Sequence, residues 1–383
     1  MSQPHPTTPN KILRPPAEIT YKDELTALQI TDTGPRPTGW KLSPRAVRTF
    51  ICGNEGAKIT FEANGERRNT DIKRKFYGDD ALIDRCIVTL LGQRGLLLVG
   101  EPGTAKSMLS ELLAAAISGD STLTIQGTAG TTEDQIKYSW NYALLLAEGP
   151  KPQALVPSPI YTGLQRGVMV RFEELTRCQP EIQDALVSVL SEKVLHIPEL
   201  SAPHALMFGE RGFNIIATAN LRDRGVNEMS SALKRRFNFE TVNPIADRAM
   251  ELRLVTEQTE KLLQEADLNV ACSPDVMELL VATFHDLRTG RTDEGTLVEK
   301  PSTVMSTAEA VAVGFSAGLD AHYFGSGKME GAHVTRQLAG TLVKDNPDDV
   351  KKIRHYFESV VKVRAKNSKA WQSCWEARRQ IGL

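Results

Sequence analysis

The stretch GEPGTAKS, residues 100–107, has residue types and a spacing suited to binding phosphate. Small residues let backbone N–H groups approach an anion, the lysine adds positive charge, and the hydroxyl that follows it can hold Mg²⁺. The alternative is a tight structural turn between a strand and a helix. A match to this pattern is expected by chance in roughly three of a hundred chains this long. Phosphate binding is therefore the favoured interpretation.

Two adjacent acids, Glu173 and Glu174, end the apolar run "GVMVRFEE". In a nucleotide site, one carboxylate helps to hold Mg²⁺, usually through water, and its neighbour polarises the attacking water. The alternative is a pair of acids that favours the dipole of the following helix. Because a phosphate loop precedes them in the chain, the catalytic interpretation is preferred.

Asn220 ends another apolar run, "FNIIATAN", and the cations Lys234, Arg235 and Arg236 follow in "SSALKRRF". An amide at a strand end can orient the lytic water or touch a γ-phosphate, although an Asx turn is the ordinary explanation. Three cations in a row usually form a solvated face. After such an asparagine, however, an arginine commonly reaches the γ-phosphate bound by a neighbouring subunit.

The hydrophobic pattern predicts the elements that position these residues. A helix at about 79–93, a strand at 95–100 and a helix at about 105–117 are followed by alternating strands and helices, which indicates a mainly parallel sheet flanked by helices. After Pro244 the sequence is helical almost throughout. The fold class is thus an α/β P-loop core with an all-helical lid. The expected regions are a disordered or extended arm at 1–40, an N-terminal extension at 41–75, the core at 76–244, and the lid with a basic tail at 245–383.

Composition argues against membrane insertion and secretion. The 383 residues are 41% hydrophobic, enough for a large core, but no apolar run approaches the roughly 18 residues of a membrane span. The first residues lack the apolar centre of a signal peptide. Five cysteines lie scattered without metal-ligand spacing. Free thiols in a reducing cytoplasm are the expectation.

The net charge of −1 conceals basic ends. Residues 1–75 carry 13 basic and 8 acidic side chains, residues 351–383 carry 9 and 2, and the middle carries 24 and 37. Basic ends can bind nucleic acid or an acidic protein face, or they can be solvated helix surfaces. Trp371 and Trp375 would share one helix face in the tail, which suggests packing or a partner groove.

The order of these motifs resembles that of the AAA+ ATPases, and among them the MoxR family. The resemblance rests on "GEPGTAKS", on "FEELTR" followed by "QPEIQDALVSVLSEK", on "IIATAN" and on "ALKRRF". "KFYGDDALIDRCIVTLL" is similar to the family segment that lines the adenine, and "PSPIYTGLQRG" to the stretch before the acidic strand. The similarity covers about 76–244 well and the helical region loosely. The long N-terminus is similar to that of the YehL-like branch.

The resemblance implies a role for each matching residue. Ser107 and Glu173 are the implied Mg²⁺ ligands, Glu174 the general base, Asn220 the sensor, and Arg236 the arginine finger, with Arg235 as its nearest competitor. The implied nucleotide-binding residues are Gly100, Glu101, Pro102, Gly103, Thr104, Ala105, Lys106, Ser107, Met108 and Tyr77.

Three positions depart from the family pattern. Ala105 stands where glycine is usual, and Glu173 is one methylene longer than the usual aspartate. In "PSTVMSTAEA", Val304 occupies the place of a second-sensor arginine, for which Lys300 or Arg291 are alternative substitutes.

The implied function is Mg²⁺-dependent ATP hydrolysis at the subunit interfaces of a homo-oligomer, a hexameric ring, that remodels or activates a protein partner. MoxR-family members resemble chaperones that act with von Willebrand factor A domain proteins. Two other classes remain open. The basic ends favour a nucleic-acid-dependent motor, whereas Glu173 and the missing lid arginine favour an ATP-binding scaffold with little turnover.

Overall fold

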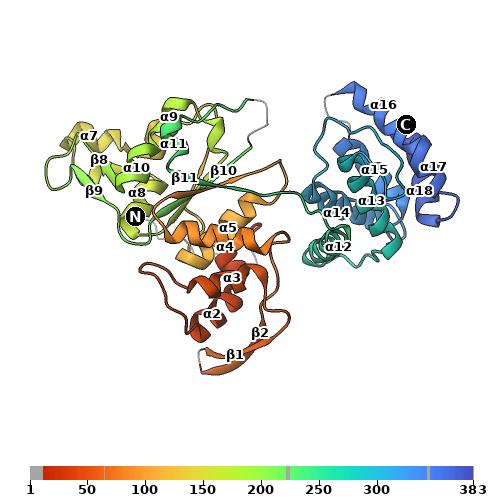
Figure 1. Ribbon diagram of the computed structural model, residues 1–383, viewed down its shortest axis with the longest axis horizontal. Coiled ribbons are helices and arrows are strands. Elements are labelled where there is room, and N and C mark those ends of the chain that lie inside the picture. The colour runs from red at the N-terminus through yellow and green to blue at the C-terminus, as the bar shows by residue number, and fades with distance from the viewer. Residues whose placement is uncertain (1–11, 64, 221–224, 343–345, 383) are drawn as a thin grey trace. The chain divides into compact units, whose positions relative to one another are not determined.

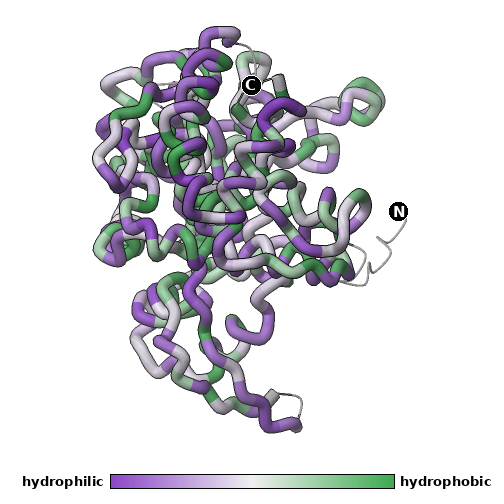
Figure 2. Tube along the Cα trace, turned by 90° about the vertical axis from the view of Figure 1, so that its right-hand side faces the viewer, coloured by the Kyte–Doolittle hydropathy of each residue, from purple (hydrophilic) through white to green (hydrophobic). Residues whose placement is uncertain are grey.

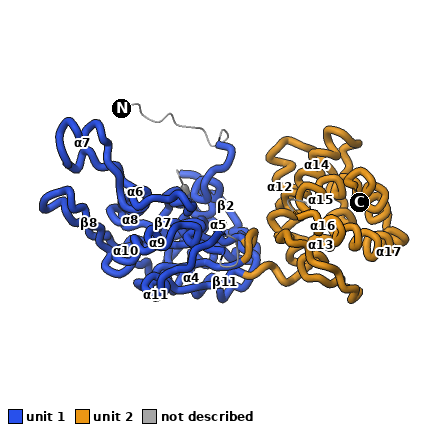
Figure 3. The backbone as a smooth tube through the Cα atoms, turned by 90° about the horizontal axis from the view of Figure 1, so that it is seen from above, with its two compact units in different colours: residues 1–100, 105–242 blue, residues 101–104, 243–383 orange. Residues whose placement is uncertain are grey.

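The chain divides into two compact units, which are described separately (Figure 3). The computed structural model describes residues 12–63, 65–220, 225–342 and 346–382. The first unit comprises residues 1–100 and 105–242, and the second comprises residues 101–104 and 243–383. Four residues of the phosphate loop are thus grouped with the second unit.

A five-stranded parallel sheet forms the centre of the first unit (Figure 1). Its spatial order is β11-β3-β10-β7-β4, and β10 pairs in parallel with both β3 and β7. Because the strands are parallel, the carboxyl ends of β3, β7 and β10 lie along the same edge of the sheet. The strands are β3 (Gly95–Val99), β4 (Thr124–Gln126), β7 (Met169–Glu173), β10 (Asn214–Ala219) and β11 (Phe237–Thr241).

Helices cover both faces of this sheet, as its fully buried central strands β3, β7 and β10 require. Leu96 and Leu98 of β3 belong to one hydrophobic cluster, whereas Leu97 and Val99 belong to another. Since successive strand residues point to opposite faces, each face has its own core. This confirms the predicted α/β core. The flanking helices include α4 (Asp80–Leu91), α5 (Lys106–Ser118), α8 (Pro159–Arg166), α9 (Pro180–Asp184), α10 (Leu186–Glu192) and α11 (Ser231–Lys234).

Two insertions in the first unit were not predicted from the sequence. One contains α7 (Tyr142–Glu148), no residue of which is buried, and the other is an antiparallel hairpin, β8 (Val194–His196) with β9 (Leu206–Phe208). Both lie at the same end of the unit in two perpendicular views (Figures 1 and 3). The first insertion also contains α6 (Glu133–Ile136), β5 (Tyr138–Trp140), η2 (Pro152–Ala154) and β6 (Leu155–Pro157).

The N-terminal region is more ordered than the sequence indicated. The hydroxyl of Ser43 accepts a hydrogen bond from the N–H of Ala46 and so caps the start of a helix. An antiparallel hairpin follows, and hydrophilic residues are frequent along it (Figure 2). The described elements are α1 (Ala17–Thr20), α2 (Lys22–Thr31), α3 (Pro44–Cys52), β1 (Lys58–Ala63) and β2 (Glu66–Asp71).

The prediction of a disordered or extended arm at 1–40 is wrong for residues 17–31, which form α1 and α2. Ala17 and Leu28 are buried in the same cluster as α5 side chains, and the N–H of Ala17 donates to Glu111 Oε1 at 3.0 Å. Glu24 also pairs with the buried Lys75 at 2.5 Å. The surface of the core supplies the apolar contacts that this Pro- and Thr-rich segment lacks by itself. Residues 1–11 lie outside the described residues.

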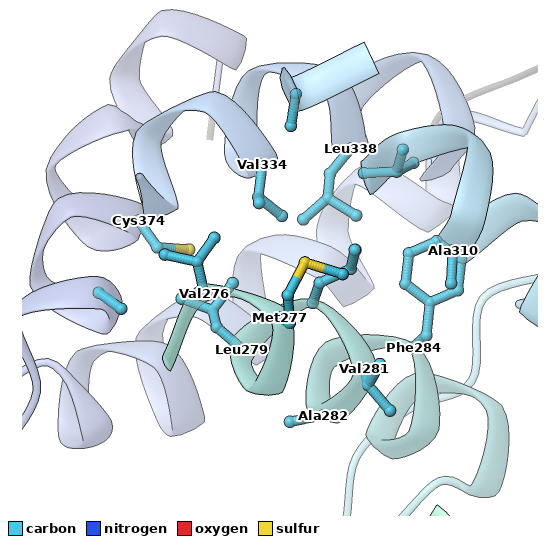
Figure 4. Packing of buried hydrophobic residues seen from close by; sticks show 14 of the residues in the cluster. Val276, Met277, Leu279, Val281, Ala282, Phe284, Ala310, Val334, Leu338 and Cys374 are labelled. Carbon is cyan, nitrogen blue, oxygen red and sulfur yellow. The ribbon is translucent and has the colours of Figure 1, made fainter. Parts of the chain in front are cut away.

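The second unit is helical, as predicted. Side chains of α13 face Val334 and Leu338 of α15 in its core, and Cys374 of α18 packs nearby (Figure 4). The basic tail is part of this unit, since Trp371 is buried and Trp375 lies against Lys362 and Arg378. The elements are α12 (Arg248–Glu265), α13 (Pro274–Thr289), α14 (Thr307–Tyr323), α15 (Gly331–Leu342), α16 (Pro347–Tyr356), the π-helical η4 (Phe357–Val361), α17 (Lys362–Arg364), α18 (Lys369–Ala377) and η5 (Arg378–Ile381).

In the described ranges, no helix combines the length and the apolar character that crossing a membrane requires. All five cysteines carry free thiols, and four of them are buried.

Candidate active site

The phosphate loop joins the end of β3 to the start of α5. Gly103 and Ala105 both have positive φ values, 75° and 66°. Ala105 is left-handed directly before the first residue of α5, which explains why glycine is usual at this place. The side chain of Lys106 is largely buried, and its Nζ donates to the carbonyl of Gly100 at 3.0 Å. Backbone N–H groups in the first turn of a helix are suited to an anion, and α5 begins at Lys106.

The hydroxyl of Ser107 and the carboxylate of Glu173 lie in direct contact. Ser107 is in the first turn of α5 and Glu173 is the last residue of β7, and Ser107 Oγ donates to Glu173 Oε2 at 2.7 Å. Thr218 Oγ1 donates to the same oxygen at 2.7 Å. The other oxygen, Oε1, accepts from Ser110 Oγ at 2.6 Å and from Arg171 Nη2 at 2.8 Å. The structure thus brings the two predicted metal ligands together.

These hydrogen bonds also determine the charge of Glu173. Burial by itself would raise its pKa, but the hydroxyls of Ser110, Ser107 and Thr218, together with the charge of Arg171, lower the pKa below its ordinary value. The carboxylate is therefore ionised at neutral pH.

Glu174 and Asn220 form a second pair at the same edge of the sheet. Glu174 has a φ of 55°, a left-handed conformation that is uncommon for a residue with a side chain. Asn220 Nδ2 donates to Glu174 Oε1 at 3.0 Å, and Arg177 Nε donates to Oε2 at 3.2 Å. Asn220 Oδ1 is buried and has no partner among the residues that the structure describes. A buried acceptor without a partner is uncommon in folded proteins.

The two candidate finger arginines follow α11 and differ in their surroundings. Arg236 donates to the hydroxyl of Ser191 and to the carbonyl of Ala232. Arg235 is exposed, and its side chain bonds to no described residue. Among the described residues, neither guanidinium bonds to the phosphate loop or to the two acids.

The remaining predicted residues lie on several different segments. Tyr77 is half-buried in the segment between β2 and α4, and Met108 is partly exposed in the first turn of α5. In the second unit, Arg291 and Lys300 are exposed in the loop between α13 and α14, and Val304 lies shortly before α14. Their roles stay predictions.

Three residues in this site were missed from the sequence: Ser110, Arg171 and Thr218. Each had a detectable signal. Ser110 lies three positions after Ser107, on the same face of a helix. Arg171 is a charge within an apolar strand, two residues before Glu173, and Thr218 stands two residues before Asn220. Alternate strand residues share a face, so both point to the side that carries Glu173.

The donor set suits Mg²⁺. Mg²⁺ is usually bound by one or two carboxylates together with substrate phosphates and water, and it prefers oxygen. Ser107 and Glu173 supply only oxygen atoms. The described part of the chain contains no cluster of three His, Cys, Asp or Glu residues for a metal held by the protein alone.

A parallel sheet in the order β11-β3-β10-β7-β4, with a phosphate loop after β3 and acids after β7, defines an AAA+ nucleotide-binding domain. Comparison with known proteins agrees. Residues 95–237 match the family described as AAA domain (dynein-related subfamily), and residues 249–382 match the YehL-like AAA+ ATPase C-terminal domain. The chain is 48% identical over 372 residues to the uncharacterized protein YehL of Escherichia coli (strain K12), covering 97% of this chain and 98% of that protein. It belongs to the YehL-like AAA+ ATPases, within the MoxR-like group.

More distant relatives are similar over part of their length. Chaperone MoxR1 of Mycobacterium tuberculosis is 26% identical over 53% of this chain and 52% of its own, and the gas vesicle ATPase GvpN of Ancylobacter aquaticus is 27% identical over 42% and 48%. Among solved structures, NtrX from Brucella abortus in complex with ADP has a TM-score of 0.49 at 12% identity, covering 81% of this chain and 67% of its own. The AAA+ domain and the ATPase relatives establish that the chain binds nucleotide and hydrolyses ATP.

Proposed function

We propose that this ATPase works with Mg²⁺, with Glu173 on the metal side and Glu174 as the general base. The observation that carries this proposal is the 2.7 Å hydrogen bond between Ser107 Oγ and Glu173 Oε2. It joins the hydroxyl of the phosphate loop to a carboxylate at the end of the acidic strand. Mg²⁺ bound here would neutralise charge on the phosphates.

The two acids are suited to different tasks. The four hydrogen bonds that the carboxylate of Glu173 accepts come from side chains on α5, β7 and β10, so the carboxylate is held in one orientation. Glu174 is more open and lies beside Asn220, whose Oδ1 has no described partner. Asn220 would accept one hydrogen bond from a water molecule, and Glu174 would take the proton of that water as it attacks. Lys106 would exchange its bond to Gly100 for the phosphates.

The catalytic unit in this proposal is a homo-oligomer, a hexameric ring. Arg236 or Arg235 of one subunit supplies positive charge to the γ-phosphate in the neighbouring site. Two observations support the arrangement: neither guanidinium bonds to the site in its own chain, and Arg235 is exposed.

The work done by the ring, in this proposal, is remodelling or activation of a protein partner with a von Willebrand factor A domain in the reducing cytoplasm. The name of the relative Chaperone MoxR1 and the five free cysteines support this part of the proposal. The alternatives are a nucleic-acid-dependent motor, which the basic ends favour, and a scaffold that binds ATP but hydrolyses it slowly.

An ATPase assay on purified protein, with and without DNA or RNA, tests the function, and a mass measurement with nucleotide tests the assembly. Lys106→Ala should abolish nucleotide binding, because no other cation in the loop can replace its charge. If Lys106→Ala bound nucleotide with wild-type affinity, the assignment of the phosphate loop would be wrong. Strong stimulation by nucleic acid would instead support the motor, and ATP binding without turnover would support the scaffold.

Mixing two inactive variants tests action between subunits. Arg236→Ala should keep ATP binding while hydrolysis falls by about 10³. Rings that also contain Lys106→Ala subunits should recover activity, because some interfaces then pair an intact loop with an intact arginine. Mixed rings that form but stay inactive would exclude action in trans. A defect in Arg235→Ala alone would assign the finger to Arg235.

A further inference from the structure

Arg171 is a buried cation inside the candidate active site, and neither the motifs nor the family comparison assigns it a role. Its side chain is 10% exposed and lies on β7, two residues before Glu173. A buried charge is costly unless its donors are satisfied. The position of Arg171 therefore needs a physical explanation.

All five N–H donors of Arg171 are used. Nε donates to Ser110 Oγ at 2.9 Å, and Nη2 donates to the carbonyl of Ser107 at 3.1 Å and to Glu173 Oε1 at 2.8 Å. Nη1 donates to the carbonyl of Ser121 at 3.1 Å and to Thr124 Oγ1 at 3.4 Å. Two of these partners belong to the first turns of α5, so the guanidinium connects the acidic strand to the helix that follows the phosphate loop.

The two oxygens of Glu173 have separate roles in this arrangement. Arg171 and Ser110 bind Oε1, whereas Ser107 and Thr218 bind Oε2. Fixing Oε1 determines where Oε2 lies, and Oε2 is the oxygen that meets the loop hydroxyl. Glutamate has one more rotatable bond than aspartate, so its carboxylate needs this additional restraint.

We propose that Arg171 is a positioning residue for the metal side of the site: it clamps Oε1 of Glu173 so that Oε2 and the hydroxyl of Ser107 are presented together to Mg²⁺. Arg171 and Glu173 then form a matched pair, in which the arginine compensates for the longer acid. This inference rests on the proposed Mg²⁺ role of Ser107 and Glu173. The competing explanation is that Arg171 only stabilises the packing of α5 on β7.

Equilibrium binding of ADP, measured calorimetrically with Mg²⁺ and with EDTA, separates the two explanations without turnover. The ratio of the two dissociation constants is the gain in affinity due to Mg²⁺. Arg171→Met should leave ADP affinity in EDTA within about twofold of wild type and reduce the Mg²⁺-dependent gain by about 10-fold, as loss of a group that orients a metal ligand typically does. A purely structural role would lower both affinities together or neither.

Two further variants keep the test decisive. Arg171→Lys retains the charge but not the five-donor geometry, and it should reduce the gain several-fold even if Arg171→Met does not fold. Arg166→Met removes a surface arginine that pairs with Asp120 at 3.0 Å in the same unit, and it should leave the gain unchanged. A folded Arg171 variant with the full gain would overturn the inference. If the wild type itself shows no gain, the proposed Mg²⁺ role fails instead.

A double-mutant cycle tests the matched pair directly. Glu173→Asp shortens the acid, so its carboxylate can no longer meet both Arg171 and Ser107. If the residues act as one unit, Glu173→Asp should add little to the loss already caused by Arg171→Lys. If the fold-reductions in the Mg²⁺-dependent gain multiply in the double variant, the two residues act independently.

Discussion

Glu173 and Glu251 are both buried glutamates that pair with an arginine and with hydroxyl groups, yet they serve different parts of the molecule. Glu173 bonds to Arg171 at 2.8 Å, and its side chain is 7% exposed. Glu251 is fully buried, and it bonds to Arg288 at 2.5 Å and 2.9 Å and to the hydroxyl of Thr307 at 2.6 Å. Burial and pairing therefore do not distinguish a functional carboxylate from a structural one.

The elements that supply the partners make the difference. Glu251, Arg288 and Thr307 belong to α12, α13 and α14, and Arg288 also donates to the carbonyl of Met305 at 3.0 Å. These bonds hold three helices together. The partners of Glu173 instead come from α5, which follows the phosphate loop, from β7 itself, and from β10, which ends directly before Asn220. The comparison predicts loss of chemistry from changes at the sheet edge and loss of stability from changes at the helical junction.

The largest effect should come from Glu174→Gln. The amide keeps the size of the side chain and loses the base, so the hydrolysis rate should fall by up to about 10⁴ while ATP stays bound. Steady-state ATPase rates and equilibrium ATP binding measure the two parts. Glu181→Gln changes an exposed glutamate of α9 in the same unit and should leave both unchanged. Normal turnover by Glu174→Gln, with ATP trapped by Glu173→Gln, would reverse the two proposed roles.

Arg288→Met should act in the opposite way. It leaves the buried carboxylate of Glu251 without its cation, which costs about 3 kcal/mol of unfolding free energy in the second unit. Denaturant unfolding measures this loss, and Arg253→Met, at an exposed position of α12, is the matched control. ADP affinity below the unfolding transition should stay close to wild type. If Arg288→Met abolished nucleotide binding without destabilising the second unit, the structural role given to Glu251 would be wrong.

The sequence was sufficient to predict those features of the site that depend on residues close together in the chain. The loop at 100–107 and the acids at 173 and 174 are short motifs, and their strands and helices were placed correctly. The contacts of Arg171 and Thr218 depend on how separate elements pack, which the sequence of one element does not determine. The helices in residues 12–40 were missed because their stability comes from burial against α5. The choice between Arg235 and Arg236 rests on the proposed contact with a neighbouring subunit, and the sequence of one chain does not determine such a contact.

Ala105→Gly should have a smaller effect, and a stabilising one. Ala105 has φ 66° and ψ 22°, a left-handed conformation that disfavours a side chain. Glycine should relieve about 1 kcal/mol of strain, partly offset by its greater freedom in the unfolded chain. Thermal unfolding of the first unit would measure the change. Ala249→Gly, in the first turn of α12, should instead destabilise, because that position is helical. If Ala105→Gly destabilised the protein, the left-handed conformation of Ala105 would not be a source of strain.

The smallest predicted effect concerns Glu294, whose carboxylate is more exposed than that of Glu251 in the same helical unit. Arg364 binds both oxygens of Glu294, at 3.1 Å and 2.7 Å, and these hydrogen bonds lower the pKa of Glu294 to about 2. Since the ordinary value is 4.5, the pair contributes its full stability above that pH and loses it as the pH falls toward 2. The side chain of Glu294 is 60% exposed, so solvent screening limits the contribution to less than about 1 kcal/mol.

The measurement for Glu294 is the difference in unfolding free energy between the wild type and Glu294→Gln. The difference should be constant above about pH 5 and shrink toward zero in acid, because the protonated wild-type side chain then resembles the amide. Glu299→Gln, at an exposed glutamate of the same loop that pairs with no described cation, should show no such trend. A difference that stays constant down to the acid transition would show that the pair with Arg364 does not contribute to stability in solution. That result would sharpen the comparison between the glutamates. It would mean that ion pairs stabilise the second unit only where they are buried, as the pair of Glu251 and Arg288 is.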